Sequence, residues 1–194
     1  MSILDLLKDQ LDAKTIGSLA ASLGIDSKMA ESAIASALPT IIGALAKNAS
    51  KPEGADKLGA ALDRDHDGSV MSQLGAAAPE LIVHGQKILA HILGPKKEAA
   101  AGGVAEKSGL PMADVMAIFG TLAPIVMGAI GKKKKEEGLD AAGVAEVLKA
   151  ERPQAKEQAG GILGMLDADG DGDIMDDLAK HAASLSSLFG GSKA

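Results

Sequence analysis

The sequence contains no cysteine, tryptophan or tyrosine, and its aromatic residues are Phe119 and Phe189. Without cysteine the chain has no disulfide, no thiolate nucleophile and no cysteine-based zinc site. Without Trp and Tyr it lacks the stacking surfaces of single-strand nucleic-acid binders, and its formal net charge of −6 repels phosphate backbones. We therefore expect no nucleic-acid partner.

The sequence also has little that would direct it to a membrane. Asp5 and Asp9 stand near the start, where a secretory signal carries a basic region. No run reaches the roughly eighteen consecutive apolar residues that are typical of a membrane span. We therefore expect a cytoplasmic chain without a membrane span.

Small aliphatic residues dominate what the sequence does contain. Hydrophobic residues make up 46% of the chain and aromatic residues 1%, so Ala, Leu, Ile, Val and Met must fill the core. A chain of this length can bury roughly two thirds of its unfolded surface. Because small side chains suit helices that approach closely, the composition and the helical spacing of apolar residues predict an all-α fold.

One module occurs twice. The segment that contains Gly24, Pro39 and Gly43 recurs around Gly109 and Pro124. An Asp-x-Asp-x-Asp-Gly motif also occurs twice, with extra residues before its second copy. We therefore predict two pseudo-repeated helical halves, residues 1–94 with a loop at 63–74 and residues 95–189 with a loop at 167–178, followed by a disordered tail at 190–194.

Apolar spacing predicts helices over residues 2–13, 14–23, 80–93 and 141–150. It also predicts a central helix, apolar nearly all round, that begins at a cap on Asp26 or Ser27 and contains Pro39. Because proline removes a backbone hydrogen bond, the helix either kinks or restarts there. The recurrence as Pro124 indicates that this feature belongs to the module.

Each Asp motif fits a calcium-binding loop. Calcium prefers six to eight oxygen ligands, and alternating acids before a glycine supply them from one tight turn. The predicted ligands are Asp63, Asp65, Asp67 and the Ser69 carbonyl in the first loop, and Asp167, Asp169, Asp171 and the Asp173 carbonyl in the second.

Neither loop has the glutamate that usually completes the calcium shell, because Leu74 and Leu178 stand at that position. In the second loop Asp176 and Asp177 can replace it, whereas the first loop would rely on water or on the other half of the protein. We therefore predict tighter binding at the second loop. The alternatives are magnesium, which usually keeps its own water, and a merely acidic, solvated turn.

Other polar clusters predict no site. His84 and His91 are poorly spaced for one metal, and His66 and His181 are expected in solvent. The run Lys132–Lys135 precedes two glutamates and is typical of a solvated helix end. No nucleophile or acid–base pair is recognisable, so we expect no enzyme.

Several segments, in this order, resemble a known family. They are His91–Gly94, Ser108–Leu110, Leu122–Gly128 and Leu166–Gly172, followed by Asp176 and Asp177. Together they resemble the bacterial domain-of-unknown-function family 937, also described as YidB-like. The resemblance implies a small helical bacterial protein without an assigned reaction. The first loop departs from the family pattern because it lacks the Asp pair after its glycine.

These observations predict a non-enzymatic, calcium-binding helical protein in which the ion is mainly structural. Two alternatives remain. Small residues on apolar helices also suit a self-associating assembly protein, and eight methionines would suit the apolar groove of a calcium sensor. The sequence identifies no protein partner.

Overall fold

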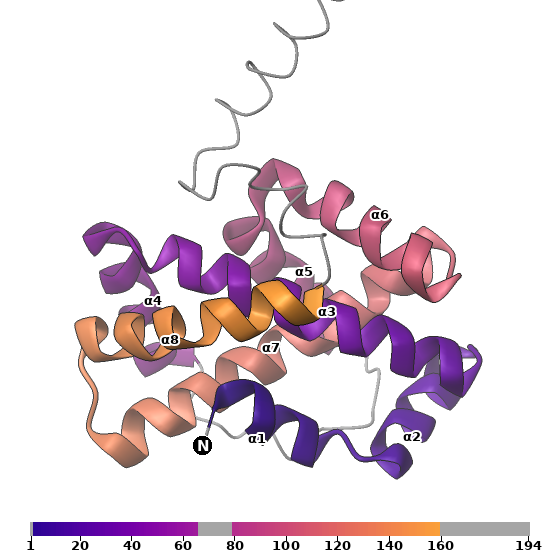
Figure 1. Ribbon diagram of the computed structural model, residues 1–194, viewed down its shortest axis with the longest axis horizontal. Coiled ribbons are helices and arrows are strands. Elements are labelled where there is room, and N and C mark those ends of the chain that lie inside the picture. Colours follow the sequence, from indigo (N-terminus) through magenta and orange to yellow (C-terminus); the bar gives the residue numbers. More distant parts are fainter. Residues whose placement is uncertain (1, 66–78, 160–194) are drawn as a thin grey trace, which may run out of the picture.

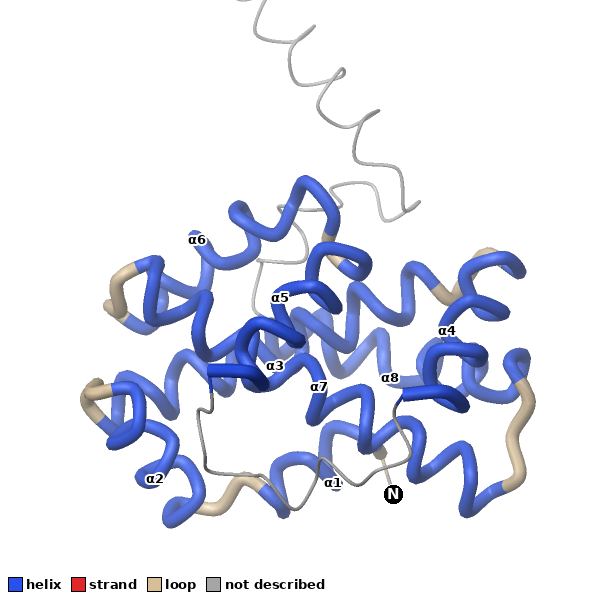
Figure 2. The backbone as a smooth tube through the Cα atoms, turned by 180° about the vertical axis from the view of Figure 1, so that it is seen from behind, coloured by secondary structure: helices blue, strands red, loops and turns tan. Residues whose placement is uncertain are grey.

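The computed structural model describes residues 2–65 and 79–159 (Figure 1). In these two ranges 89% of the residues are helical and no strand is present, which confirms the predicted all-α class. Figure 2 shows the same helices from behind. The elements are α1 (Ile3–Gln10), α2 (Ala13–Leu23), α3 (Ser27–Asn48), α4 (Pro52–Asp65), α5 (Pro79–Ile92), the short 3₁₀ helix η2 (Gly94–Lys96), α6 (Lys97–Ser108), α7 (Met112–Glu137) and α8 (Ala141–Ala159).

Side-chain caps start the first three helices. The Ser2 hydroxyl accepts a hydrogen bond at the start of α1, Asp12 Oδ1 accepts one from the Thr15 amide at 2.7 Å, and Asp26 caps α3 as predicted. Each cap satisfies amides that a helix leaves unpaired in its first turn. The Thr15 hydrogen bond also lowers the pKa of Asp12 below its ordinary value.

Left-handed glycines end three helices. Gly24, Gly109 and Gly138 have φ values of 70°, 73° and 63° after α2, α6 and α7. An L side chain is strained in this region, whereas glycine is not. The chain can therefore reverse direction sharply between one helix and the next.

Helices α3 and α7 form the centre of the molecule. Most of their residues are buried, and these buried residues lie on every face of each helix, as the nearly uniform apolarity of the two segments predicts. Pro39 lies inside α3 and Pro124 inside α7, and both helices continue through them. The alternative of a helix that restarts at the proline is therefore wrong.

The remaining helices cover this central pair. Helix α8 packs against α3 (Figure 1), and α5 packs against α7. Leu4 of α1, Leu58 of α4, Leu89 of α5 and Leu148 of α8 belong to the same buried cluster as the residues of α3 and α7. Residues from both predicted halves thus share one hydrophobic core.

The crossing of α5 and α7 depends on glycine. A Cβ atom on Gly85 would lie 1.7 Å from the carbonyl oxygen of Gly120, far inside van der Waals contact. Pro124 has no amide hydrogen to donate to Gly120, one helical turn earlier, so this carbonyl lacks its usual partner within the helix. The backbone of Gly85 approaches that carbonyl directly.

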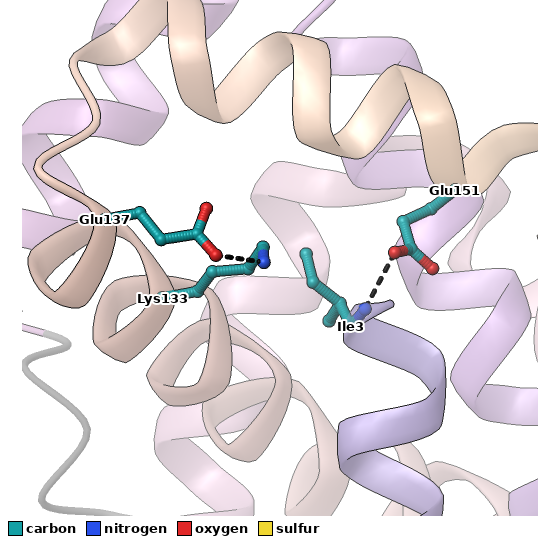
Figure 3. Close-up of polar contacts among 4 residues, drawn as sticks. All are labelled: Ile3, Lys133, Glu137 and Glu151. Carbon is teal, nitrogen blue, oxygen red and sulfur yellow. Dashed lines mark hydrogen bonds and ion pairs between the residues drawn. The ribbon is translucent and has the colours of Figure 1, made fainter. Parts of the chain in front are cut away.

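A buried carboxylate joins the last described helix to the first. Glu151 of α8 is 5% exposed, and its Oε1 accepts a hydrogen bond from the Ile3 amide at 2.7 Å (Figure 3). Its Oε2 accepts one from the Leu4 amide at 3.4 Å. Helix α8 therefore caps the N-terminus of α1 with a negative charge, where the helix dipole favours one.

The expectation of no membrane-spanning segment is wrong. Helices α3 and α7 have apolar windows of mean hydropathy 1.4 and 1.8, and both are long and apolar enough to cross a membrane by length and composition. Requiring an uninterrupted apolar run missed them, because small polar residues such as Ser36 and Thr40 interrupt the run without lowering the mean much. In this fold 72% and 78% of the two windows are buried, so the same apolarity also serves the core. The cytoplasmic location stays a prediction.

The predicted boundary between the halves lies at Gly94, the first residue of η2, shortly after the end of α5. The boundaries at 94 and 189 stay predictions, and the tail at 190–194 lies outside the described residues.

Candidate functional site

The first Asp motif begins on the last turn of α4. Asp63 and Asp65 are both exposed and helical, and Asp65 is the final residue of the helix. The chain is described again from Pro79, where α5 begins. The first two predicted ligands are therefore placed at the end of a helix, with a second helix following.

The other predicted ligands lie outside the described residues. They are Asp67, Ser69, Asp167, Asp169, Asp171, Asp173, Asp176 and Asp177. Their roles stay predictions. In the part of the chain that is described, no group of three or more His, Asp or Glu side chains is arranged to hold a metal ion.

A residue of the second predicted half contacts the first motif, but this residue is a cation and not an additional oxygen ligand. Lys134 of α7 places its Nζ 2.5 Å from Asp63 Oδ1. The Lys134 side chain is 14% exposed, whereas Asp63 is 66% exposed. A largely buried ammonium therefore occupies one side of the carboxylate that was predicted to begin the calcium loop.

This pairing changes the interpretation of the lysine run at the end of α7. Lys133 is 18% exposed and pairs with Glu137 at 2.6 Å (Figure 3), whereas Lys132 is 52% exposed and lies 3.8 Å from Glu136. The helix end is thus only partly solvated. No sequence pattern predicts the contact between Lys134 and Asp63, because α4 and the end of α7 are far apart along the chain.

The next acid of the motif is also paired. Asp65 Oδ2 lies 2.7 Å from the Arg64 guanidinium. The hydrogen bond and the charge of Asp65 raise the pKa of Arg64 above its ordinary value. Both described acids of the first motif are therefore neutralised by cations within the protein.

A cleft opens beside the same end of α4. This feature, the α4–α5 cleft, has a volume of about 760 Å³ and lies between α4, α5 and the end of α3. Leu45, Leu58 and Ile92 are among its apolar lining residues. Asn48 Nδ2 donates a hydrogen bond to the Ile92 carbonyl at 2.8 Å, which ties the end of α3 to the end of α5.

His84 and His91 also line the α4–α5 cleft. Both are exposed, and His91 Nδ1 lies 2.8 Å from the Lys87 carbonyl, one turn earlier in α5. Neither belongs to a metal-holding group among the residues described. Sequence spacing did not anticipate that they share a cleft with α3 and α4.

The described residues form a helical fold with a shared hydrophobic core, and the acids Asp63 and Asp65 at the end of α4 form ion pairs with Lys134 and Arg64. The family described as bacterial protein of unknown function (DUF937) matches residues 5–133, and the chain belongs to this family. The match confirms the resemblance seen in the sequence, although it ends before α8 and the second Asp motif. Neither a curated protein nor a solved structure matches the chain.

The expectation of possible self-association finds no support. Of the large hydrophobic side chains in the described ranges, Val83 and Met112 are exposed, at 55% and 44%. Val83 lies on α5 and Met112 at the start of α7.

Proposed function

We propose that this chain is a non-enzymatic, calcium-binding helical protein in which the ion is mainly structural. The observation that carries the proposal is the position of Asp63 and Asp65 at the end of α4, with α5 beginning at Pro79. A calcium loop needs its first acids at the end of one helix and a second helix after it. The positions of Asp63 and Asp65 support this arrangement for the first motif.

The ion pairs of the first motif support unequal binding. Calcium at this loop must displace Lys134 from Asp63 and Arg64 from Asp65, or share these carboxylates with them. Each nearby cation repels the ion. The second loop also has the additional acids Asp176 and Asp177. We therefore expect the second loop to bind calcium more tightly than the first.

Calorimetric titration with calcium tests the proposal on the full chain. We expect two phases in the wild type, with the tighter phase lost in the double variant Asp167→Asn/Asp169→Asn and the weaker phase lost in Asp63→Asn/Asp65→Asn. Millimolar calcium should also raise the melting temperature, since an ion that binds only the folded state stabilises it. A titration without heat, together with an unchanged melting curve, would overturn the proposal.

A lysine variant tests the competing cation separately. Lys134→Met should lower the calcium dissociation constant of the weaker phase about tenfold, which corresponds to about 1.4 kcal/mol of binding free energy. Lys132→Met makes the same charge change two residues earlier on α7, where the side chain is 52% exposed and pairs with Glu136. If both variants change the weaker phase equally, Lys134 does not compete directly for Asp63.

We also propose that the two halves are copies of one module. Helices α3 and α7 each contain a proline near the middle, and each follows a helix that ends at a left-handed glycine, Gly24 or Gly109. The φ values of these glycines differ by a few degrees. These matching features support the pseudo-repeat and, with it, one Asp loop at the corresponding place in each half.

A further inference from the structure

The α4–α5 cleft concentrates positive charge on an acidic protein. Its lining contains five cations, Lys47, Lys51, Lys57, Arg64 and Lys87, against two carboxylates, Glu53 and Asp65. Arg64 and Asp65 already pair with each other, which leaves four lysines facing one further carboxylate. The whole chain carries a formal net charge of −6, so this excess is local. A concave site with one sign of charge attracts ligands of the opposite sign.

One of these lysines has a polar group without a partner. The Lys47 ammonium is buried and makes no hydrogen bond within the described part of the chain. Lys47 lies in the last turn of α3, where the helix dipole favours a positive charge. The dipole does not satisfy the donors of the ammonium group, and a buried charge without hydrogen bonds is costly. An anion in the cleft would supply the missing acceptors.

The shape and the lining restrict the ligand further. A volume of about 760 Å³ lies within the range of pockets that hold small organic molecules, roughly 300–1,000 Å³. Leu58, Ile88 and Met127 add apolar surface to the lysines, and the described lining contains no Phe, Tyr or Trp, its rings being the imidazoles of His84 and His91. The organic part of a ligand would therefore contact mainly aliphatic side chains.

We propose that the α4–α5 cleft binds a small aliphatic phosphate ester, with its phosphate group at Lys47 and the neighbouring lysines. A phosphate monoester carries nearly two negative charges at neutral pH and offers three strong acceptor oxygens, which matches a site of several cations. A single carboxylate would leave most of the positive charge uncompensated. Its main contacts come from Lys47, Lys57 and Lys87 of α3, α4 and α5, and none of these lysines is a predicted calcium ligand, although Asp65 of the first motif also lines the cleft.

Calorimetric titration of the full chain with glycerol 3-phosphate, in calcium-free buffer at low salt, tests the proposal. We expect saturable binding of one ligand per chain that weakens as salt is added. Lys47→Met and Lys87→Gln should each weaken it at least about tenfold. Lys28→Met is the matched control, because Lys28 is exposed at the opposite end of α3 and its loss changes the net charge equally.

Lys47→Met has a second readout. Without ligand, this variant should melt at a higher temperature than the wild type, because it replaces a buried, unpartnered ammonium with an apolar side chain of similar length. Lys87 is exposed, so Lys87→Gln keeps the test valid if Lys47→Met fails to fold.

Three results would overturn the proposal. The first is the absence of saturable binding in the wild type. The second is equal weakening in Lys28→Met and Lys47→Met, which would show attraction by overall charge alone. The third is binding to phosphatidylglycerol vesicles without binding of the soluble ester, which would assign the lysines to a lipid surface. Because calcium is absent throughout, none of these results bears on the proposed calcium loops.

Discussion

The contact between Glu151 and the start of α1 should be one of the most sensitive points of the fold. Ile3 is 2% exposed and Leu4 is fully buried, so their amides have no access to water if the carboxylate is removed. Glu151→Ala removes both acceptors and leaves a cavity. Hydrogen bonds to a charged group contribute about 1.5–3 kcal/mol. A charge at a helix N-terminus adds about 0.3–1 kcal/mol.

We therefore expect Glu151→Ala to lower the free energy of unfolding by about 3 kcal/mol. Glu151→Gln keeps one oxygen for the Ile3 amide but loses the charge, and burial penalises that charge in the wild type. These effects partly cancel, so Glu151→Gln should lower the free energy of unfolding by less, about 1 kcal/mol. Removal of the acceptor should thus outweigh removal of the charge.

Urea unfolding followed by far-ultraviolet circular dichroism measures these differences. Glu146→Ala is the matched control on the same helix, because the Glu146 side chain is 73% exposed and forms a surface ion pair with Lys149. It should change stability by less than about 0.5 kcal/mol. If Glu151→Ala and Glu146→Ala lie within about 0.5 kcal/mol of each other, Glu151 does not stabilise α1 as argued.

Three further predictions follow from the helices. Gly85→Ala should lower the free energy of unfolding by about 3 kcal/mol, because its Cβ would force α5 away from the Gly120 carbonyl. Gly17→Ala should raise the free energy of unfolding by about 0.5–1 kcal/mol, since no neighbouring atom lies within 4 Å of its Cβ position. Urea midpoints that rank the two variants the other way would contradict this. Asp12→Ala should destabilise the protein at neutral pH. Because the pKa of Asp12 in the folded protein lies below 3.8, the wild type should be more stable than the variant above that pH, and this difference in stability should disappear as the pH falls through the lowered pKa. If the difference in stability persists in strong acid, the charge of Asp12 does not account for the stabilisation by the cap. The full chain should give a strongly helical circular dichroism spectrum, and a strand content above about a fifth would contradict the fold.

Local signals in the sequence account for most of the helices. Asp26 predicted the start of α3, and the glycines at 24, 109 and 138 mark helix ends because only glycine tolerates the left-handed conformation without strain. The helix predicted over 141–150 was too short. Helix α8 continues to Ala159 through Pro153, because its packing along α3 outweighs the local cost of the proline.

The conformation at the first Asp motif was only partly predictable. The pattern predicted a loop from residue 63, whereas the structure continues α4 through Asp65. The roles of Asp63 and Asp65 as ligands stay predictions. The partners of these acids were not predictable. Lys134 is distant in sequence, and only the packing of α4 against α7 brings its ammonium to Asp63.

By itself, the sequence determined the all-α class, the two long apolar helices and the family, because helical spacing, capping residues and ordered motifs are local properties of the chain. Tertiary structure alone decided which charges that are distant in sequence meet. Lys47, Lys57 and Lys87 lie on three different helices and show no common pattern along the sequence. They line one cleft because α4 and α5 pack beside the end of α3, and the burial of the Lys47 ammonium follows from that packing.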